Sequence, residues 1–223
     1  MEEIIIKYED ILKNEEIKTY ISKADLSLKS MGYTDHSASH VIKCAEVVKR
    51  ILTTLDYSSR DINLGQIAAY MHDIGNVVNR HNHAQNGAIM AFNILNRLNM
   101  SSEDIATIIN AIGNHDEHDG FPVNPVTAAL ILADKTDVRR SRVRNTDNMA
   151  TDIHDRVNYA VKENEIDINK ETRTLTLKLT LDISITPIMD YFEIFFQRMS
   201  MCINAAKALD IKFKLVINEQ ELL

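Results

Sequence analysis

The chain has 223 residues, a formal net charge of −7, and few glycines and prolines. This length suffices for one sizeable core, or for a core with a smaller annex. The scarcity of glycine and proline favours helices over a turn-rich β-sandwich. The acidic balance excludes a sequence-independent binder of duplex nucleic acid, which needs a basic surface, but it allows a nucleotide held by one local cationic cluster.

No apolar run approaches the ~18 residues that a membrane span needs. The acidic N-terminal segment lacks the basic start and the small-residue cleavage site of a signal peptide. Cys44 and Cys202 lie in apolar helical patterns, so we expect two buried free thiols. A cytoplasmic protein without a membrane partner is therefore predicted.

Residues 1–145 are predicted to form a succession of amphipathic helices, because apolar residues recur there at helical spacing. The pattern places helices at about 17–31, 36–55, 62–74, 83–98, 101–115 and 126–140. Gly32 and Gly75 mark two helix ends, and Thr34 or Asp35 is a candidate N-cap for the second helix.

The pattern changes after residue 145. Apolar and polar residues alternate from Leu175 to Ile185, which predicts a half-buried strand, and residues 166–168 predict a shorter strand that joins it through a hairpin turn. Pro187 is predicted to occupy the first position of a helix, and residues 213–217 to form a last strand. The sequence thus predicts a mainly α fold, with a helical metal-binding domain over 1–145 and a small α+β subdomain over 146–223.

The doublet His72-Asp73 directly follows the apolar run 67–71. A buried imidazole and a buried carboxylate must be paired or must coordinate a metal, and both are ligand types that divalent cations prefer. Further side chains of these types lie near predicted helix ends: His40, His83, His115 and Asp134. Facing helices commonly build metal sites in this way. Six such ligands would suit two cations about 4 Å apart, bridged by a carboxylate.

Five phrases between about residues 33 and 142 resemble, in order, the HD-domain superfamily of metal-dependent phosphohydrolases. HVIKCAEVV, from His40, resembles the HxxRVAxxA opening, and AAYMHDIGN, residues 68–76, resembles the HDIG signature AALLHDIGK. HAQNGA, from His83, resembles the HxxxGA segment of members with two metals. NHDEHDGFP, residues 114–122, resembles the HHExxDGxGYP segment of the HD-GYP branch, and LILADKTDVR, residues 130–139, resembles the closing LxxADxxDxxR helix.

Two departures from the family pattern bear on the substrate. Asn114 stands where the HD-GYP branch has a histidine, and its GYP triplet is shortened to Gly120-Phe121-Pro122, which argues against cyclic di-GMP. Asn76 replaces the lysine that usually follows the HDIG phrase, which removes a cation that often faces the substrate phosphate.

The resemblance implies a helical fold and hydrolysis of phosphoesters or phosphoanhydrides, often of nucleotides. It implies a first metal held by His40, His72, Asp73 and Asp134. It implies a second metal held by Asp73, His83 and His115, with Asp73 as the bridging ligand that holds the hydroxide. One or two divalent transition metals are expected, and Fe, Mn, Co, Ni or Zn would each fit these ligands. Serine and cysteine do not stand beside a recognisable base, so covalent catalysis is not expected.

Several roles stay open at this stage. His36 and Asp116 are alternative members of the site. Lys135 and Arg139, spaced i and i+4, are candidates for binding the substrate phosphate, with a solvated helix end as the alternative interpretation.

We expect a hydrolase for a small phosphorylated substrate, nucleotides being the favoured class. The alternative is a catalytically weak regulatory module that binds metal and nucleotide. The apolar stripe over residues 192–199 indicates either core or the surface of a homodimer.

Overall fold

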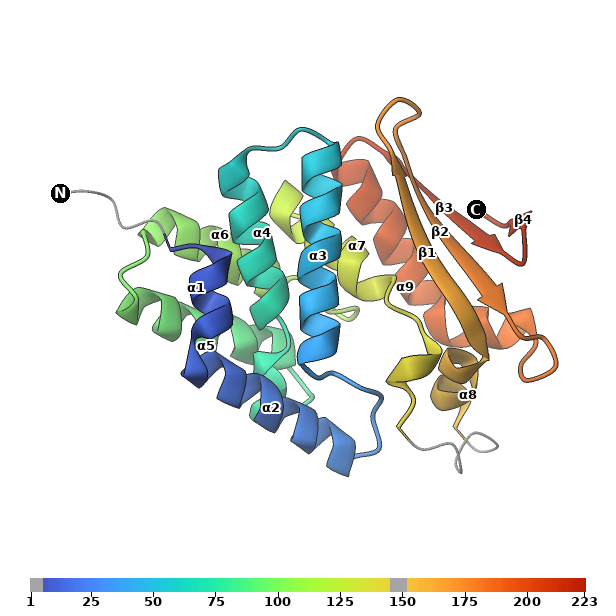
Figure 1. The fold of residues 1–223 in the computed structure, drawn as a ribbon, viewed down its shortest axis with the longest axis horizontal. Helices are drawn as coiled ribbons and strands as arrows, with labels where there is room; N and C mark the ends of the chain where they lie inside the picture. The colour runs from blue at the N-terminus through green and yellow to red at the C-terminus, as the bar shows by residue number, and fades with distance from the viewer. Residues whose placement is uncertain (1–5, 145–151) are drawn as a thin grey trace.

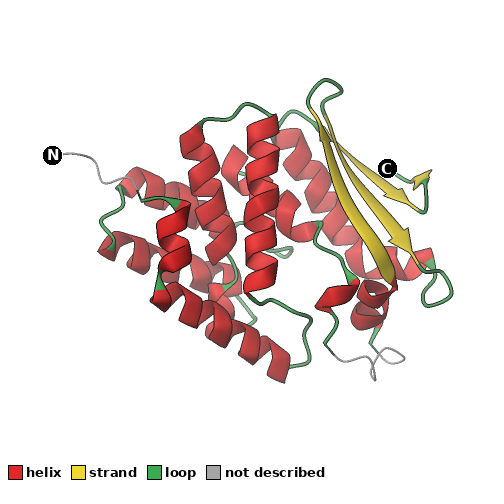
Figure 2. Ribbon diagram, in the orientation of Figure 1, coloured by secondary structure: helices red, strands yellow, loops and turns green. Residues whose placement is uncertain are grey.

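The computed structural model describes residues 6–144 and 152–223 and shows a helical body with a small sheet at one end (Figure 1). The predicted boundary between residues 145 and 146 adjoins the gap between these ranges and lies outside the described residues. Helices account for most of the described chain, and strands occur together at its C-terminal end (Figure 2). The predicted mainly α fold with a C-terminal α+β part is confirmed.

The helical body contains α1 (Tyr8–Lys13), α2 (Glu15–Ser30), α3 (Ala38–Thr54), α4 (Ser59–Met71), the 3-10 helix η1 (Ile74–Val77), α5 (His83–Arg97), α6 (Ser102–Gly113), α7 (Pro125–Lys135) and the 3-10 helix η2 (Arg140–Arg142). Polar side chains cap several of these helices by accepting backbone N–H bonds. Ser37 caps α3, two residues beyond the predicted Asp35, because its hydroxyl accepts from the Ser39 amide. Gly32 ends α2 as predicted and has φ +85°, a conformation that favours glycine.

The core is densest where α3, α4 and α7 pack together. Residues 64–71 of α4 and 126–133 of α7 are all buried, which explains why their sequences lack a polar face. Gly65 lets α4 approach α3 closely, because a Cβ there would lie 2.7 Å from Cγ1 of Val48. This close contact sets the relative position of α3 and α4, each of which has one end at the site described below.

The C-terminal part contains α8 (Ile153–Ala160), β1 (Val161–Asn169), β2 (Thr174–Leu181), α9 (Ile188–Ala208), β3 (Lys212–Ile217) and β4 (Gln220–Glu221). The sheet has the order β1-β2-β3-β4. β1 and β2 form an antiparallel hairpin, β2 and β3 run parallel and are joined through α9, and β4 is antiparallel to β3. In Figure 1, α9 lies between the sheet and the helical body.

Four details differ from the sequence predictions. α8 was not predicted, and its N-terminus is capped by Asp152. α7 ends at Lys135 rather than near residue 140, and Arg139 is extended, with φ −160°. β2 ends at Leu181, where the carboxylate of Asp182 accepts bonds from the Ser184 amide and hydroxyl and turns the chain. Pro187 is the N-cap of α9 rather than its first helical residue.

Side chains fasten the C-terminal part to the helical body. Arg50 of α3 donates to the Ile166 carbonyl at 2.8 Å. Asn164 of β1 donates to the carbonyls of Thr136 and Val138 at 2.7 and 2.8 Å. One continuous cluster of buried apolar residues runs through both parts, so the two parts share a core.

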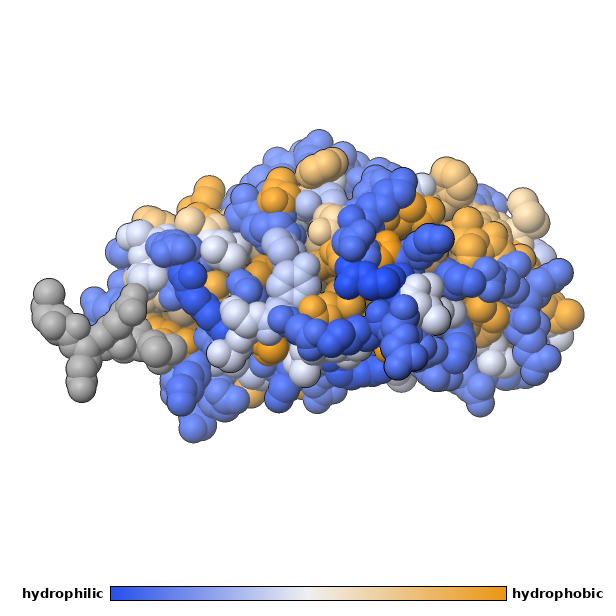
Figure 3. All heavy atoms as spheres, turned by 90° about the horizontal axis from the view of Figure 1, so that it is seen from above, coloured by the Kyte–Doolittle hydropathy of each residue, from blue (hydrophilic) through white to orange (hydrophobic). Residues whose placement is uncertain are grey.

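Figure 3 shows one face of the molecule, on which hydrophilic residues surround smaller apolar areas. None of the described helices is long and apolar enough to cross a membrane.

Candidate metal centre

The six side chains predicted to bind metal converge where several helices begin or end. His40 lies in the first turn of α3, His83 begins α5, and Asp134 is in the last turn of α7. His72 and Asp73 join α4 to η1, and His115 follows α6. Five of these six residues are buried, and the side chain of Asp134 is 13% exposed. The structure therefore brings together every ligand that the resemblance implied.

Each of the four histidines has a hydrogen-bond acceptor at its Nδ1 atom. The acceptors for His40, His72, His83 and His115 are Asp137 Oδ2 at 2.8 Å, Ala69 O at 2.8 Å, Arg80 O at 3.1 Å and Ile112 O at 2.6 Å, respectively. A carbonyl or carboxylate oxygen can only accept, so Nδ1 carries the proton in each ring. The Nε2 lone pair is thereby left free for a cation.

These Nε2 atoms face one another inside the protein. His83 Nε2 lies 3.2 Å from His115 Nε2, and the buried Nε2 of His72 has no hydrogen-bond partner within the described residues. Two lone pairs at that distance repel, and an orphaned buried nitrogen is costly. Divalent cations would satisfy these atoms, so the residues present fit a metal centre.

Asp73 spans two groups of these ligand atoms. Its Oδ2 lies 3.3 Å from His72 Nε2 and 3.8 Å from His40 Nε2, whereas its Oδ1 lies 3.6 Å from His83 Nε2. The sets His40–His72–Asp73 and Asp73–His83–His115 each keep their ligand atoms within 4.8 Å of one another. These two groups fall within the two sets that the resemblance implied, and a third group, His72–His115–Asp134, is equally compact and includes members of both.

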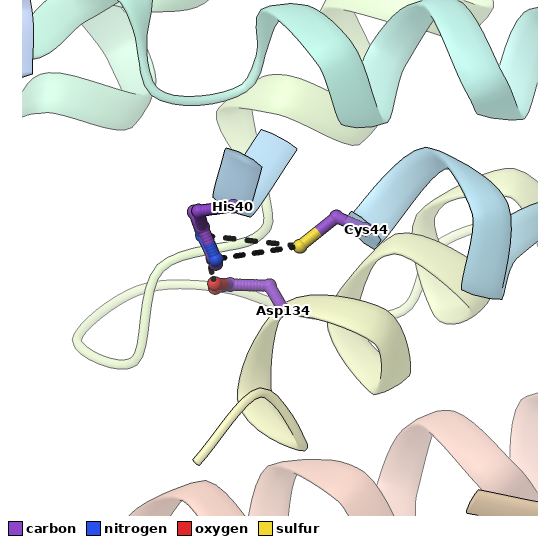
Figure 4. Close-up of side chains that lie close together, drawn as sticks. All are labelled: His40, Cys44 and Asp134. Atoms are coloured by element: carbon purple, nitrogen blue, oxygen red, sulfur yellow. Dashed lines mark hydrogen bonds and ion pairs between the residues drawn. The ribbon is translucent and has the colours of Figure 1, made fainter. Parts of the chain in front are cut away.

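Asp134 completes the first group. Its Oδ1 lies 3.3 Å from His40 Nε2 and 3.8 Å from His72 Nε2. Figure 4 shows His40 and Asp134 pointing toward each other, with Cys44 beside the imidazole ring.

Cys44 lies one helical turn after His40, with its Sγ 3.7 and 3.8 Å from the two ring nitrogens. Burial raises the pKa of the Cys44 thiol well above its usual range, and nearby Asp134 adds to the effect. Without a cation the thiol is therefore neutral and packs against the His40 ring, while its Sγ also forms a compact group of possible ligand atoms with His40 and Asp134. Cys44 and Cys202 are both buried and free, as predicted.

Burial and neighbouring charges set the protonation of the ligands. Burial alone would raise the pKa of Asp73 and Asp134, but His72 beside Asp73 and Lys135 beside Asp134 bring both pKa values well below the usual range. Burial lowers the pKa of His83. At neutral pH these carboxylates are ionised and His83 is neutral, which are the forms that bind a cation.

Asn76 supports the bridging carboxylate. It is fully buried, and its Nδ2 donates to the carbonyl of Asp73 at 3.0 Å and to Oδ1 of Asp73 at 2.8 Å. The residue therefore orients Asp73 instead of facing a substrate. The sequence marked Asn76 only as a departure from the family pattern.

Asp137 supports His40 in the same manner. Its Oδ2 accepts the Nδ1–H bond of His40, and its Oδ1 lies 2.7 Å from Nζ of Lys43. Asp137 is the second acid of the phrase LILADKTDVR, which was the signal for it.

The two predicted phosphate-binding residues are both engaged by carboxylates. Lys135 is only 6% exposed, and its Nζ lies 2.7 Å from Asp134 Oδ2 and 3.5 Å from Glu117 Oε1. Nε of Arg139 lies 2.9 Å from Asp137 Oδ1, and Arg139 does not line the cavity beside the centre. With α7 ending at Lys135, the two residues do not share a helix face.

A cavity of about 990 Å³ opens beside the second group of ligands, and its walls include His36, Tyr33, Arg80 and Asp116. His36 packs edge-on against His40, with the ring centroids 5.6 Å apart. Oδ1 of Asp116 lies 4.0 Å from His83 Nε2. The two residues left open by the sequence thus lie at the border between ligands and cavity.

Arg80 is a cavity residue that the sequence analysis missed. Its Nη1 lies 3.3 Å from Asn76 Oδ1 and 3.4 Å from His83 Nε2, and its guanidinium stands over the Tyr33 ring at 5.6 Å. The other arginines that line the cavity within the described chain, Arg142 and Arg198, each lie within 4 Å of a carboxylate oxygen. Arg80 forms no such ion pair with any of the residues that the structure describes.

Comparison with known proteins finds similar sequences and a similar structure. The family model of the HD domain matches residues 37–156. The uncharacterized protein MJ1020 of Methanocaldococcus jannaschii is 24% identical over 160 residues, which cover 61% of this chain and 61% of that protein. The chain thus spans less than two thirds of the relative that it matches.

A solved structure is also similar to the chain. It is the crystal structure of a predicted HD superfamily hydrolase from an uncultured Thermotogales bacterium, with a TM-score of 0.46 and 20% identity over 60% of this chain and 75% of that one. The family match covers more than half of the chain and includes all six convergent residues, so the chain belongs to the HD-domain family.

Proposed function

We propose that the protein is a phosphohydrolase with two divalent metals, and that it hydrolyses a small phosphate ester or anhydride, nucleotides being the favoured class. HD domains bind divalent metals. The observation that carries the proposal is the set of four histidines that each use Nδ1 for a hydrogen bond and bring Nε2 into one cluster with the carboxylates of Asp73 and Asp134. When bound, two cations would supply a hydroxide nucleophile from water near neutral pH and would neutralise the phosphoryl oxygens.

Other side chains of the protein orient the candidate metal ligands. Asp73 presents one oxygen to each ligand group and so sets the spacing between the two metals. Asn76 fixes that carboxylate by donating to its Oδ1. Asp137 fixes the His40 ring and its tautomer. Partners of this type tune both the affinity and the orientation of metal ligands.

Arg80 supplies the cation that Asn76 lacks. Its guanidinium borders both the second ligand group and the cavity, and it is not neutralised by a carboxylate. With a metal at His83 Nε2, that nitrogen would no longer accept from Arg80. The remaining donors of the guanidinium would be available to phosphate oxygens, for which its planar fork is suited.

Two features of the cavity favour a nucleotide over a smaller ester. Its volume of about 990 Å³ is at the upper end of the range for ligand pockets. The ring of Tyr33 lines it and is partly exposed, so it offers a surface on which a base can stack.

The test begins with untagged protein purified without chelator and loaded with Mn²⁺, Fe²⁺ or Co²⁺. We expect about two metals per chain and hydrolysis of a subset of phosphate esters in a broad screen. Asp73→Ala should abolish both metal binding and hydrolysis, because Asp73 serves both groups. Retained hydrolysis in that variant would refute the mechanism.

A regulatory role is the second candidate, since Asn76 replaces a catalytic-site lysine and the loop after His115 departs from the family pattern. It would be favoured by tight nucleotide binding without turnover in the same screen.

A further inference from the structure

The C-terminal part is in contact with the metal centre through one loop. This loop, residues 114–124, joins α6 to α7 and carries His115. Gln197 of α9 donates to the Glu117 carbonyl at 2.7 Å, and Arg198 Nε lies 2.6 Å from Glu117 Oε1. A Cβ on Gly120 would overlap the methyl group of Met201. Residues from one face of α9 therefore hold the loop at three points.

Glu117 is the junction between α9 and the ligands. Its Oε1, which pairs with Arg198, also lies 3.5 Å from Nζ of Lys135. Lys135 in turn contacts Oδ2 of Asp134 at 2.7 Å. These contacts hold the Glu117 side chain between α9 and Lys135 of α7, and Lys135 keeps its own contact with Asp134.

This row is sheltered from solvent. The Arg198 and Glu117 side chains are 24% and 19% exposed, and Lys135 is 6% exposed. Burial alone would lower the pKa of Lys135, but Asp134 and Glu117 raise it above its usual value, so the lysine stays charged. Partly buried ion pairs hold their partners more firmly than exposed pairs do, because screening is weaker.

We infer that α9 positions the ligands of the second metal, and that the Arg198–Glu117 pair is the contact through which it does so. This inference rests on the proposed dinuclear centre. His115 and Asp116 directly precede Glu117 in the loop, so releasing Glu117 from α9 frees the segment that places the His115 ring opposite His83. The C-terminal part is then a component of the metal centre, and Arg198 is a positioning residue.

If Arg198 is a positioning residue, replacing it should weaken the binding of the second metal and not of the first. Arg198→Ala should keep the metal held by His40, His72 and Asp134, and should bind the second metal roughly 10–100-fold more weakly, the range seen when supporting partners of metal ligands are removed. Glu117→Gln should have the same effect. The double variant should be no worse than either single variant, because both remove one interaction.

The experiment is a calorimetric titration of metal-free, full-length protein with Mn²⁺, combined with amide hydrogen exchange of the segment 114–120 before metal is added. Arg173→Ala is the matched control, since Arg173 pairs with Asp210 beyond the C-terminal end of α9. Arg198→Lys keeps the charge and should recover much of the second-metal affinity.

The outcomes separate this inference from the proposed function. Selective loss of the second metal with faster exchange in segment 114–120 supports the inference, whether or not hydrolysis is found. Two tight metals and unchanged exchange in Arg198→Ala would overturn it and leave the proposed function standing. Fewer than two metals in the unmodified protein would overturn both.

Discussion

Nε2 of His83 and Nε2 of His115 lie 3.2 Å apart, and neither carries a proton, because both rings donate from Nδ1 to backbone carbonyls. Without a cation, the protein holds two hydrogen-bond acceptors face to face in a buried site. Their rings meet nearly at right angles, at 82°, and Nε2 of His83 also lies 3.6 Å from Oδ1 of Asp73. The arrangement costs stability unless a cation occupies it.

The first prediction removes one of these rings. His83→Ala should bind about one metal per chain where the unmodified protein binds about two, because the first group keeps His40, His72 and Asp134. Elemental analysis of dialysed protein measures this. The control is His118→Ala, whose side chain is 83% exposed. Loss of both metals would show that the two groups do not bind independently.

The second prediction concerns Asn76. Asn76→Ala removes the donor to Oδ1 of Asp73, so both metals should bind more weakly, by about 10–100-fold. Competition with a chelating dye measures the affinities. Asn93→Ala, on the exposed face of α5, is the control and should leave them unchanged. An unchanged affinity in Asn76→Ala would show that Asp73 is held by the backbone alone.

The third prediction tests the phosphate-binding cation. Arg80→Ala should weaken substrate binding by about 10–100-fold, in line with the loss of one charge-assisted hydrogen bond. Metal stoichiometry should not change. Steady-state kinetics on a substrate found in the screen would show the effect chiefly in KM. Arg97→Ala, which breaks only an exposed pair with Glu16, is the control.

Arg139→Ala decides between the sequence prediction and the structure in the same assay. If Arg139→Ala raises KM and Arg80→Ala does not, Arg139 is the phosphate-binding residue, as the sequence predicted.

The fourth prediction concerns the backbone that places His83. A Cβ on Gly75 would overlap the His83 carbonyl and the Gly87 amide, neither of which is a flexible side-chain end. Gly75→Ala should therefore lower the free energy of unfolding by at least about 1–3 kcal/mol, measured by urea denaturation. Gly113→Ala is the matched comparison, since its Cβ would meet only Ala88 at 3.7 Å. Equal stability of the two variants would contradict the close packing of η1 on α5.

The fifth prediction concerns pH and the C-terminal part. Bonds from Ser184 and Lys162 lower the pKa of Asp182 from 3.8 to about 2. Because the pKa is lower in the folded state, the stabilisation is present above the unfolded value and is lost as the pH falls toward 2. The difference in unfolding free energy between the unmodified protein and Asp182→Asn should thus be largest above pH 4 and shrink toward pH 2. A difference in unfolding free energy that does not change with pH would show that the ionised Asp182 carboxylate is not the source of the stabilisation.

Sequence periodicity predicted the helices of the body because most of them have one buried face. The Ser37 cap, the end of α7 and the end of β2 were placed differently, since each depends on a local side-chain bond that competes with helical or strand pattern. Thr136 illustrates this, because its hydroxyl donates to the Leu132 carbonyl at 2.5 Å just where α7 ends. α8 has only 8 residues, so its sequence offered little periodicity.

The six ligand positions could be proposed from sequence because the resemblance fixed their order along the chain. The supporting residues could not, because support is a matter of distance in three dimensions. Asp137 bonds to His40 across 97 positions. Arg80 and Arg198 both line the cavity, but Arg80 lies shortly before α5 and Arg198 lies in α9. No rule of sequence spacing relates these two positions.

The candidate ligands span residues 40 to 134 and come from five helices that meet only in the finished bundle. During synthesis, a nascent chain that has not yet released residue 134 lacks a complete first site, and the α9 support for the second site is made last of all. A metal that needs the complete set of candidate ligands could therefore bind only late in the synthesis of the chain.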